Sequence, residues 1–255
     1  TAELLQSLDG AMITGCDLNT SLEDMERLTE LTPHVLAAVG SPVDASAATA
    51  HGTLGAVEAV LEAELKDAKP GRALVHGCGA VGGTVARTLV EHGWTVFTVD
   101  LSRERAGFPG ATPLPQGCPW WELKLDLLLP CSISGLINAE MASALRVTSV
   151  VPAANAPFQS PQLADALRQR GIRVLPDPLV NAGAVIADSI ERFSPDAWKD
   201  AGAKDVYAFV REEVRRRATG YLNQRDQGLS VGAALNEVAA APATDPIGLS
   251  FGDAA

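Results

Sequence analysis

The chain has 255 residues, which is enough for one large α/β domain or two small ones. Hydrophobic residues make up 47% and charged residues 20%, an ordinary globular composition, and the net charge of −11 argues against binding nucleic acid or anionic membranes. No apolar run approaches the 18 residues of a membrane span. The four cysteines are widely spaced without a Cys-x-x-Cys pair. This fits a reducing compartment, the cytoplasm or an organelle matrix, better than disulfides or a metal site.

Residues 1–35 are expected to be the remainder of a separate small domain. Thr1–Leu8 is typical of the end of a helix, residues 11–17 predict a short strand that ends on Asp17, and Ser21 begins a helix with a capping-box pattern. On spacing alone, Asp17 is better explained as a loop acid beside a helix cap than as a functional residue. Because the first residue is Thr1 and not Met, we expect a processed, trimmed or fragmentary chain.

Residues 36–195 are expected to form a doubly wound domain with a parallel sheet, and 196–255 to form C-terminal helices and a tail. After a small-residue linker at 38–48 and a helix at 50–66, the segment 73–100 dominates the pattern. It predicts a buried strand, a glycine turn, a helix and a second strand that ends on an acid.

The glycine turn matches G-x-G-x-x-G with Gly77, Gly79 and Gly82. The first permits a tight turn, the second a close approach of a pyrophosphate, and the third close packing of the helix on the strand. Asp100 lies about 20 residues further on, where an acid accepts hydrogen bonds from ribose hydroxyls. The expected cofactor contacts in this segment are Gly77, Gly79, Ala80, Val81, Gly82, Asp100 and Leu101.

The expected cofactor is NAD, because no arginine immediately follows Asp100 and an acid there repels the 2′-phosphate of NADP. A purely structural strand–turn–helix is the alternative interpretation of the motif.

Further strands and helices alternate along the rest of the chain. Residues 103–121 have no assignable elements, and Trp120 and Trp121 are expected to be packing residues. Strands are expected at 126–129, 147–151 and 172–175, and helices from about 138 and at 161–169, 182–193, 203–219 and 230–240, before a frayed tail at 242–255. In a parallel sheet the loops that follow the strands line one cleft, here at Asp100, Cys131, Asn155 and 177–181.

Six segments in order resemble the glutamate/leucine/phenylalanine/valine dehydrogenases. They are TGCDLNTSLEDM (14–25), SAATAHGTLGAVEAV (46–60), GCGAVGG (77–83), LLPCSISGLIN (128–138), PAANAP (152–157) and PDPLVNAGAVI (176–186). The resemblance implies NAD-linked oxidative deamination of an L-amino acid to a 2-oxo acid. It implies an acid/base role for Asp17 and places Thr49, Cys131, Asn155 and Asn181 around the nicotinamide or substrate. It also implies a homo-oligomer or a subunit of a larger complex, closest to the phenylalanine and leucine branch.

The sequence departs from the family in one major respect. In the family, about a hundred residues precede the Asp17 segment and carry a glycine-rich segment with the catalytic lysines, and this segment is absent here. Smaller departures are Ser134, Pro152 and Ala184, each where the family has glycine. Two hypotheses follow: a dehydrogenase whose first segment is missing from this chain, or an inactive, dehydrogenase-derived nucleotide-binding or structural subunit. A Rossmann domain of another oxidoreductase explains the motifs less well.

Overall fold

The computed structural model describes residues 1–16, 20–36, 39–64 and 70–241. Its centre is a six-stranded sheet in the order β3-β2-β1-β4-β5-β6, with every neighbouring pair parallel. The strands are β1 (Arg72–His76), β2 (Thr95–Val99), β3 (Ala111–Pro113), β4 (Lys124–Pro130), β5 (Arg146–Val150) and β6 (Arg173–Val174). This order is that of a dinucleotide-binding, doubly wound sheet, so the predicted fold class is confirmed.

Alternate residues of the strands enter two separate cores, one on each face of the sheet. Ala73 and Val75 of β1 join one cluster, and Leu74 between them joins the other. The first face is covered by α3 (Ala45–Glu64), α4 (Ala80–Glu91), α11 (Ala203–Asp226) and α12 (Val231–Ala240). The second is covered by η1 (Trp120–Glu122), α6 (Ala139–Ala144) and α7 (Pro161–Gln169). Burial on both faces explains why the central strands β1 and β4 contain the consecutive apolar residues 73–75 and 127–129.

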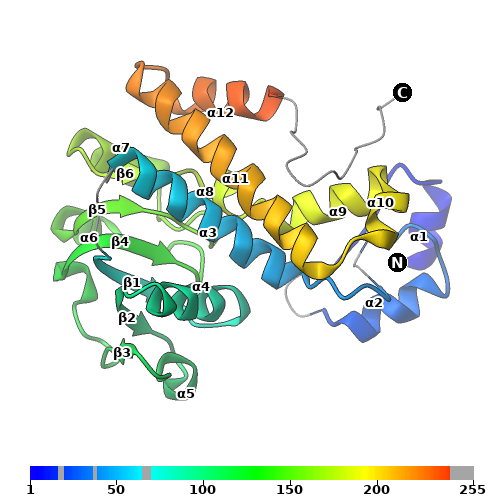
Figure 1. Cartoon of the computed structure of the whole chain (residues 1–255), viewed down its shortest axis with the longest axis horizontal. Coiled ribbons are helices and arrows are strands. Elements are labelled where there is room, and N and C mark those ends of the chain that lie inside the picture. Colours follow the sequence, from blue (N-terminus) through cyan, green and yellow to red (C-terminus); the bar gives the residue numbers. More distant parts are fainter. Residues whose placement is uncertain (17–19, 37–38, 65–69, 242–255) are drawn as a thin grey trace.

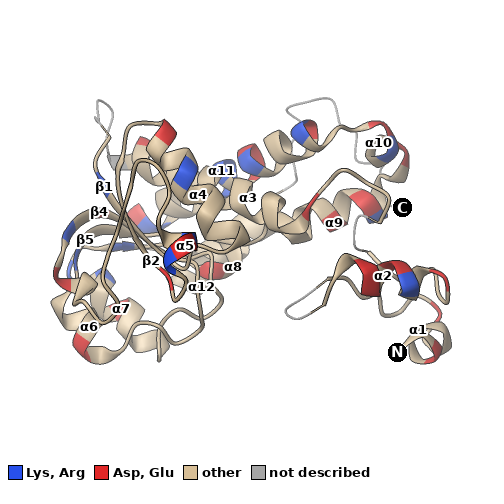
Figure 2. Cartoon of the chain, turned by 90° about the horizontal axis from the view of Figure 1, so that it is seen from below, with Lys and Arg blue, Asp and Glu red and all other residues tan. Residues whose placement is uncertain are grey.

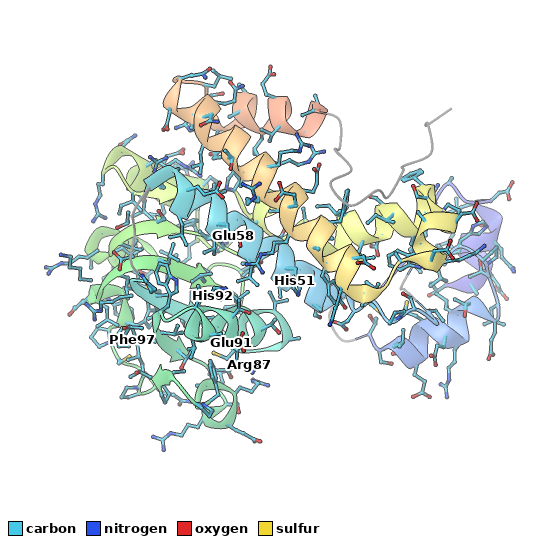
Figure 3. The ribbon with its side chains drawn as sticks, viewed as in Figure 1. His51, Glu58, Arg87, Glu91, His92 and Phe97 are labelled. Carbon is cyan, nitrogen blue, oxygen red and sulfur yellow. The ribbon has the colours of Figure 1, made fainter. Side chains whose placement is uncertain are left out.

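The long helices α3 and α11 pack side by side over the first face (Figure 1). A Cβ on Gly55 of α3 would lie 2.1 Å from the carbonyl oxygen of Arg211 of α11, so the two backbones approach too closely for any side chain there. The Arg211 guanidinium returns across the contact to Glu58, with Nε and Oε1 3.0 Å apart, and His51 stacks on Tyr207 with ring centroids 4.9 Å apart. Figure 3 shows His51 and Glu58 along α3.

Four shorter helices lie at the far end of α3 and α11 from the sheet (Figure 1). They are α1 (Ala2–Ser7), α2 (Leu22–Thr29), α9 (Gly183–Phe193) and α10 (Pro195–Asp200). Helix α2 begins at the predicted capping box, in which Ser21 and Asp24 bond each other's backbone N–H groups. Figure 2 shows that Asp and Glu predominate on α2, whereas charges of both signs alternate along α11. None of the helices in the described ranges is long and apolar enough to cross a membrane.

Several expected elements differ in the structure. The strand at 11–17 is wrong: its described residues make only an isolated bridge between Thr14 and Val35. The linker at 38–48 is too long, because α3 already begins at Ala45, where the Asp44 carboxylate accepts a hydrogen bond from the Ala47 N–H. That bond caps the helix five residues earlier than the apolar pattern indicates.

The stretch at 103–121 is more ordered than expected. It contains α5 (Arg103–Ala106) and the edge strand β3, and η1 begins at its end. A further short helix, α8 (Asp177–Val180), was not expected either. The tail at 242–255 lies outside the described residues, and the domain boundaries at 35/36 and 195/196 stay predictions.

Candidate cofactor site

The three glycines of the turn after β1 serve two structural purposes. Gly77 has a φ of +94°, and a Cβ there would lie 2.7 Å from the Cα of Ser132. A Cβ on Gly82 would lie 1.9 Å from the Gly77 carbonyl oxygen and 2.8 Å from the Cβ of Cys131. Around Gly79, apart from its chain neighbours, no heavy atom lies within 4 Å of the Cβ position. Gly77 and Gly82 therefore permit close packing, whereas Gly79 leaves the turn open to a ligand.

Helix α4 begins directly at this open position. Gly79 is its N-cap, and Ala80 and Val81 are its first two residues. The first N–H groups of a helix have no partner within the helix and carry a partial positive charge. The expected contacts Ala80 and Val81 therefore lie where a phosphate group binds most readily.

Asp100 follows β2 and joins the turn to the next loop. One carboxylate oxygen accepts a hydrogen bond from the Cys78 N–H at 2.7 Å, and the other accepts one from the Ser102 N–H, also at 2.7 Å. Burial, the largest single influence, raises the pKa of the Asp100 carboxyl, but its hydrogen bonds together outweigh burial and hold that pKa below the ordinary value. Asp100 is therefore ionised at neutral pH.

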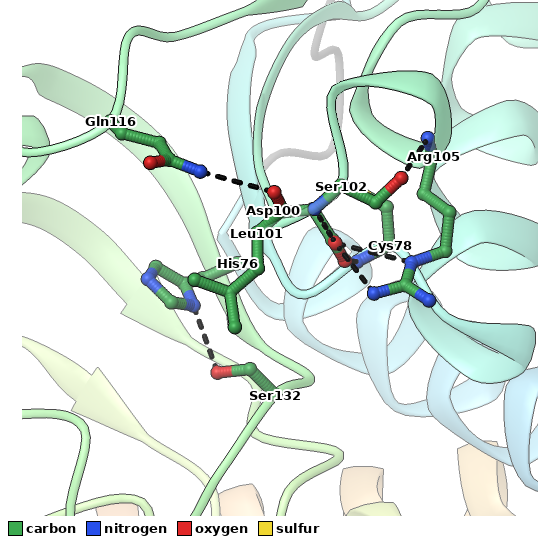
Figure 4. A network of polar contacts seen from close by, with 8 residues as sticks. All are labelled: His76, Cys78, Asp100, Leu101, Ser102, Arg105, Gln116 and Ser132. Atoms are coloured by element: carbon green, nitrogen blue, oxygen red, sulfur yellow. Dashed lines mark hydrogen bonds and ion pairs between the residues drawn. The ribbon is translucent and has the colours of Figure 1, made fainter.

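An arginine that the sequence analysis did not single out completes this group of contacts. Helix α5 returns Arg105 to Asp100, whose Oδ1 accepts hydrogen bonds from Nε at 3.1 Å and from Nη2 at 2.9 Å. Figure 4 shows both bonds. The backbone N–H of Arg105 also donates to the Oγ of Ser102, the N-cap of α5. The short helix α5 therefore brings a guanidinium to the acid without an arginine next to it in sequence.

A cavity of about 640 Å³ lies beyond the carboxyl ends of β1, β2 and β4. Five of the expected contact residues line it, namely Gly77, Gly79, Asp100, Leu101 and Cys131. Leu101 is 89% exposed, which is unusual for a leucine and leaves its side chain free to cover an apolar ligand. The ends of β1, β2 and β4 thus meet at one cavity, whereas Asn155 and residues 177–181, which were expected at the same cleft, do not line it.

His76, at the end of β1, also lines this cavity. Its Nδ1 lies 2.8 Å from the Oγ of Ser132 (Figure 4). Its ring lies 5.3 Å from that of Trp120. Burial, more than any other influence, lowers the pKa of His76. Trp120 is 5% exposed and belongs to the second core, which confirms its predicted packing role.

The two asparagines expected at the nicotinamide end lie together. The Nδ2 of Asn181 donates to the Oδ1 of Asn155 at 2.7 Å and to the carbonyl oxygen of Ala153 at 3.3 Å. In the same loop, Ala156 has a φ of +42° and its N–H donates to the Asp177 carboxylate at 2.9 Å. Two loops that follow different strands are therefore joined by side-chain amides and one carboxylate.

Thr49 reaches the same region from α3. It lies inside the helix, where its Oγ1 donates to the Ala45 carbonyl oxygen. A Cβ on Gly183, the first residue of α9, would lie 2.2 Å from the Ala48 carbonyl oxygen and 2.7 Å from the Thr49 Cα. The backbone of α3 at Thr49 is thus in close contact with the start of α9, which follows Asn181 by two residues.

Comparison with known proteins agrees with this architecture. The sequence model of the glutamate/leucine/phenylalanine/valine dehydrogenase family matches residues 102–241, more than half of the chain. The chain belongs to this dehydrogenase family.

Individual relatives agree with the family assignment. The phenylalanine dehydrogenase of Lysinibacillus sphaericus is 27% identical over 230 residues, which are 85% of this chain and 60% of that protein. The structure of L-tryptophan dehydrogenase from Nostoc punctiforme has a TM-score of 0.75 at 23% identity, covering 93% of this chain and 68% of that one. The hetero-hexameric glutamate dehydrogenase of Thermus thermophilus has a TM-score of 0.73 at 20% identity, covering 93% and 65%.

The match to these dehydrogenases is partial in length. The chain spans between 52% and 60% of the length of the phenylalanine dehydrogenases that it matches. The similarity of the two solved structures, both below 25% identity, concerns the fold alone.

The dehydrogenase acid expected from the motifs, Asp17, lies outside the described residues. Sequence reasoning missed another carboxyl group with an unusual environment, that of Asp188 on α9. Burial, and next the charge of Glu191, raise the pKa of Asp188 on α9 to about 6. Asp188 is also the main charge that, after burial, raises the pKa of the Cys16 thiol, so these two side chains lie near each other. An aspartate within a helix that has both polar and apolar neighbours forms no sequence motif that indicates a raised pKa.

One departure from the dehydrogenase motifs has a visible effect. Ser134, where the family has glycine, donates its hydroxyl to the Asn155 carbonyl oxygen at 2.7 Å and ties two loops together. The cysteine in this region, Cys131, has a pKa raised to about 12 by burial, so it remains a neutral thiol. This agrees with its interpretation as a packing residue.

A second cavity, of about 470 Å³, lies between α9, α11 and α12 and is mostly apolar. Its charged residues Glu213 and Arg217 are paired with each other, so they are not available to orient a ligand. Within the described ranges, no group of three or more His, Cys, Asp or Glu side chains is placed to hold a metal ion.

Proposed function

We propose that this chain binds NAD and supplies the cofactor-binding part of an L-amino-acid dehydrogenase. The observation that carries the proposal is the open N-terminus of α4 at Gly79, joined through the Cys78 N–H to the Asp100 carboxylate beside one cavity. These groups fit a dinucleotide: N–H groups for the pyrophosphate, a carboxylate for ribose hydroxyls and an apolar cavity for the base. The family membership supports the same assignment.

The reaction class is oxidative deamination: an L-amino acid, water and NAD⁺ give a 2-oxo acid, ammonium, NADH and a proton. When bound, NAD accepts the two electrons and the hydrogen that leave the α-carbon of the amino acid. The residues of this chain bind and orient the reactants. The Asn155–Asn181 pair holds two uncharged amides at the nicotinamide end, and Asp17 accepts and returns a proton.

We also propose that these 255 residues alone do not turn over amino acids. The reaction needs a cation to hold the substrate carboxylate and polarise water, which the family resemblance assigns to lysines. The described lysines do not supply it: Lys124 begins β4, at the end of the strand opposite the cavity, and Lys199 and Lys204 lie on α10 and α11. A dehydrogenase needing a further segment and an inactive nucleotide-binding subunit are both consistent with this.

Two measurements test the proposal. Isothermal titration with NAD⁺ is expected to show one site per chain, and Asp100→Ala to weaken it at least about tenfold because the ribose acceptor is lost. Absence of binding at millimolar NAD⁺ removes the cofactor site under both interpretations. Formation of NADH from any L-amino acid, followed by absorbance, contradicts the prediction of no turnover.

We propose in addition that the chain assembles with further subunits or copies of itself. Large apolar side chains are exposed around α1 and α2: Leu4 is 58%, Met12 50% and Leu31 60% exposed. Such a concentration of apolar surface is typical of an interface. Light scattering after gel filtration is expected to give a mass above that of one chain, and a monomer at micromolar concentration contradicts homo-oligomerisation.

A further inference from the structure

The carboxylate expected to bind the adenosine ribose is already engaged by a cation. Asp100 accepts two hydrogen bonds from the Arg105 guanidinium in addition to its two backbone partners. The Asp100 side chain is only 7% exposed, whereas that of Arg105 is 57% exposed. The group that a ligand meets first at this end of the site is therefore the guanidinium.

Arg105 also faces the relevant space. It lines the same cavity as Gly79 and Asp100. Figure 4 shows its guanidinium directed at the Asp100 carboxylate. Its bonds to Asp100 use Nε and Nη2, so the two N–H groups of Nη1 are not consumed by the pair. Planar guanidinium donors of this kind match the oxygens of a phosphate group.

The net charge of Asp100 and Arg105 decides which dinucleotide the site accepts. An isolated carboxylate accepts hydrogen bonds from ribose hydroxyls and repels a 2′-phosphate. The Nη2 atom of Arg105 lies 2.9 Å from the Oδ1 atom of Asp100. The positive charge of the guanidinium therefore offsets the negative charge of the carboxylate, and the pair repels a 2′-phosphate less than Asp100 alone does. The Asp100–Arg105 pair therefore no longer selects against the 2′-phosphate of NADP.

We propose that Arg105 makes this site accept a 2′-phosphorylated dinucleotide, so that the chain binds NADP as well as NAD. The inference rests on the proposed dinucleotide site and changes its expected selectivity. The expectation of NAD alone relied on the absence of an arginine directly after Asp100. That reason does not hold in the folded chain, because helix α5 brings Arg105 back to the Asp100 carboxylate.

The chain offers a matched control for the test. Arg103 lies in the same four-residue helix and carries the same charge, but it does not line the cavity. Arg105→Ala removes the guanidinium at the site, Arg105→Lys keeps the charge, and Arg103→Ala removes one charge nearby. Circular dichroism and thermal melting verify that each variant is folded.

Isothermal titration with NAD⁺, NADP⁺ and adenosine 2′,5′-bisphosphate, at low ionic strength, measures the effect. For the unaltered chain we expect the dissociation constants of the two dinucleotides to agree within about tenfold. Arg105→Ala is expected to raise the NADP⁺/NAD⁺ ratio of dissociation constants at least about tenfold and to weaken the bisphosphate similarly, whereas Arg103→Ala changes the ratio less than about threefold. Arg105→Lys is expected to retain most of the NADP⁺ affinity.

Three results overturn the proposal, and they are distinguishable. If NAD⁺ binds and NADP⁺ binds more than tenfold more weakly, the selectivity inference fails and the proposed function stands. If the ratio changes less than tenfold in Arg105→Ala, or equally in Arg103→Ala, Arg105 is not the determinant. If neither dinucleotide binds, the proposed cofactor site itself is wrong.

Discussion

The side-chain amide of Asn181 donates a hydrogen bond to that of Asn155 across 2.7 Å, and the direction of this bond is fixed by the second acceptor of Asn181, the Ala153 carbonyl oxygen. The loop after β5 is thereby attached to the segment that precedes α9. Both residues are expected at the nicotinamide, so the bond sets the relative position of two candidate ligand groups. Four predictions follow from this and other contacts.

The direction of the Asn181–Asn155 bond predicts different effects of an Asn→Asp substitution at the two positions. Asn181→Asp places a carboxylate oxygen against two acceptor oxygens and is expected to lower the free energy of unfolding by about 1–3 kcal/mol at pH 7.5. Asn155→Asp keeps the acceptor for the Asn181 amide and is expected to change the free energy of unfolding by less than about 0.5 kcal/mol. Urea denaturation measures both, and equal losses in the two variants contradict the assigned direction.

The two glycines at either side of the α4 start separate folding from binding. Gly82→Ala brings a Cβ within 1.9 Å of backbone and is expected to prevent normal packing of α4 on β1. Gly79→Ala meets open space at a φ of −70°, so we expect normal folding and weaker dinucleotide binding. Thermal melting and titration with NAD⁺ separate the effects. Unchanged NAD⁺ affinity in a folded Gly79→Ala variant argues against a pyrophosphate at this turn.

The acid stability of the chain depends in part on Asp100. Its pKa is lower in the folded chain than the ordinary 3.8, so its contribution to stability is present above that value and is lost as the pH falls through the lowered pKa. In Asp100→Asn this contribution is absent. The difference in unfolding free energy between the two proteins is therefore expected to shrink as the pH decreases below about 4. Unfolding in urea at several pH values measures it, and a constant difference contradicts the prediction.

Asp188 is expected to have the opposite pH dependence. Its folded pKa of about 6 lies above the ordinary 3.8, so ionisation in the folded state destabilises the chain as the pH rises from 4 to 6. Asp188→Asn is expected to be more stable than the unaltered chain above pH 6, by on the order of 1 kcal/mol, and no more stable below pH 4. Asp196→Asn, at an almost fully exposed side chain, is the control for the removal of one carboxyl charge. A variant without the pH-dependent gain shows that Asp188 titrates normally.

The fold was predictable from the sequence because its signals are local. The glycine turn, the acid of Asp100 and the buried strands depend on spacing within about 30 residues, and the structure places them as expected. The prediction of a strand at 11–17 was wrong because it, too, relied on a local signal alone. A short apolar run indicates burial, but pairing depends on a neighbouring strand, and the described residues of this segment pair only through the bridge of Thr14 with Val35.

The residues that sequence reasoning missed depend on tertiary contacts. Arg105 reaches Asp100 only because Ser102 caps the four-residue helix α5, too short for a periodic pattern to indicate. Asp188 acquires its environment from burial and from Glu191 on the same helix. The proximity of Asn155 and Asn181 was expected from the topology, but the bond between their side chains was not.

The pairing of α3 with α11 has a consequence for how the chain assembles. Glu58 and Arg211 are 153 positions apart, so α3 leaves the ribosome well before the helix that covers it. Until α11 is made, the glycine-lined side of α3 lacks its natural neighbour, and the sheet with α4 can form first because its contacts are more local. We therefore expect closure of the fold to be a late event, and we expect a chain cut before Ala203 to expose this surface permanently and to be prone to aggregation.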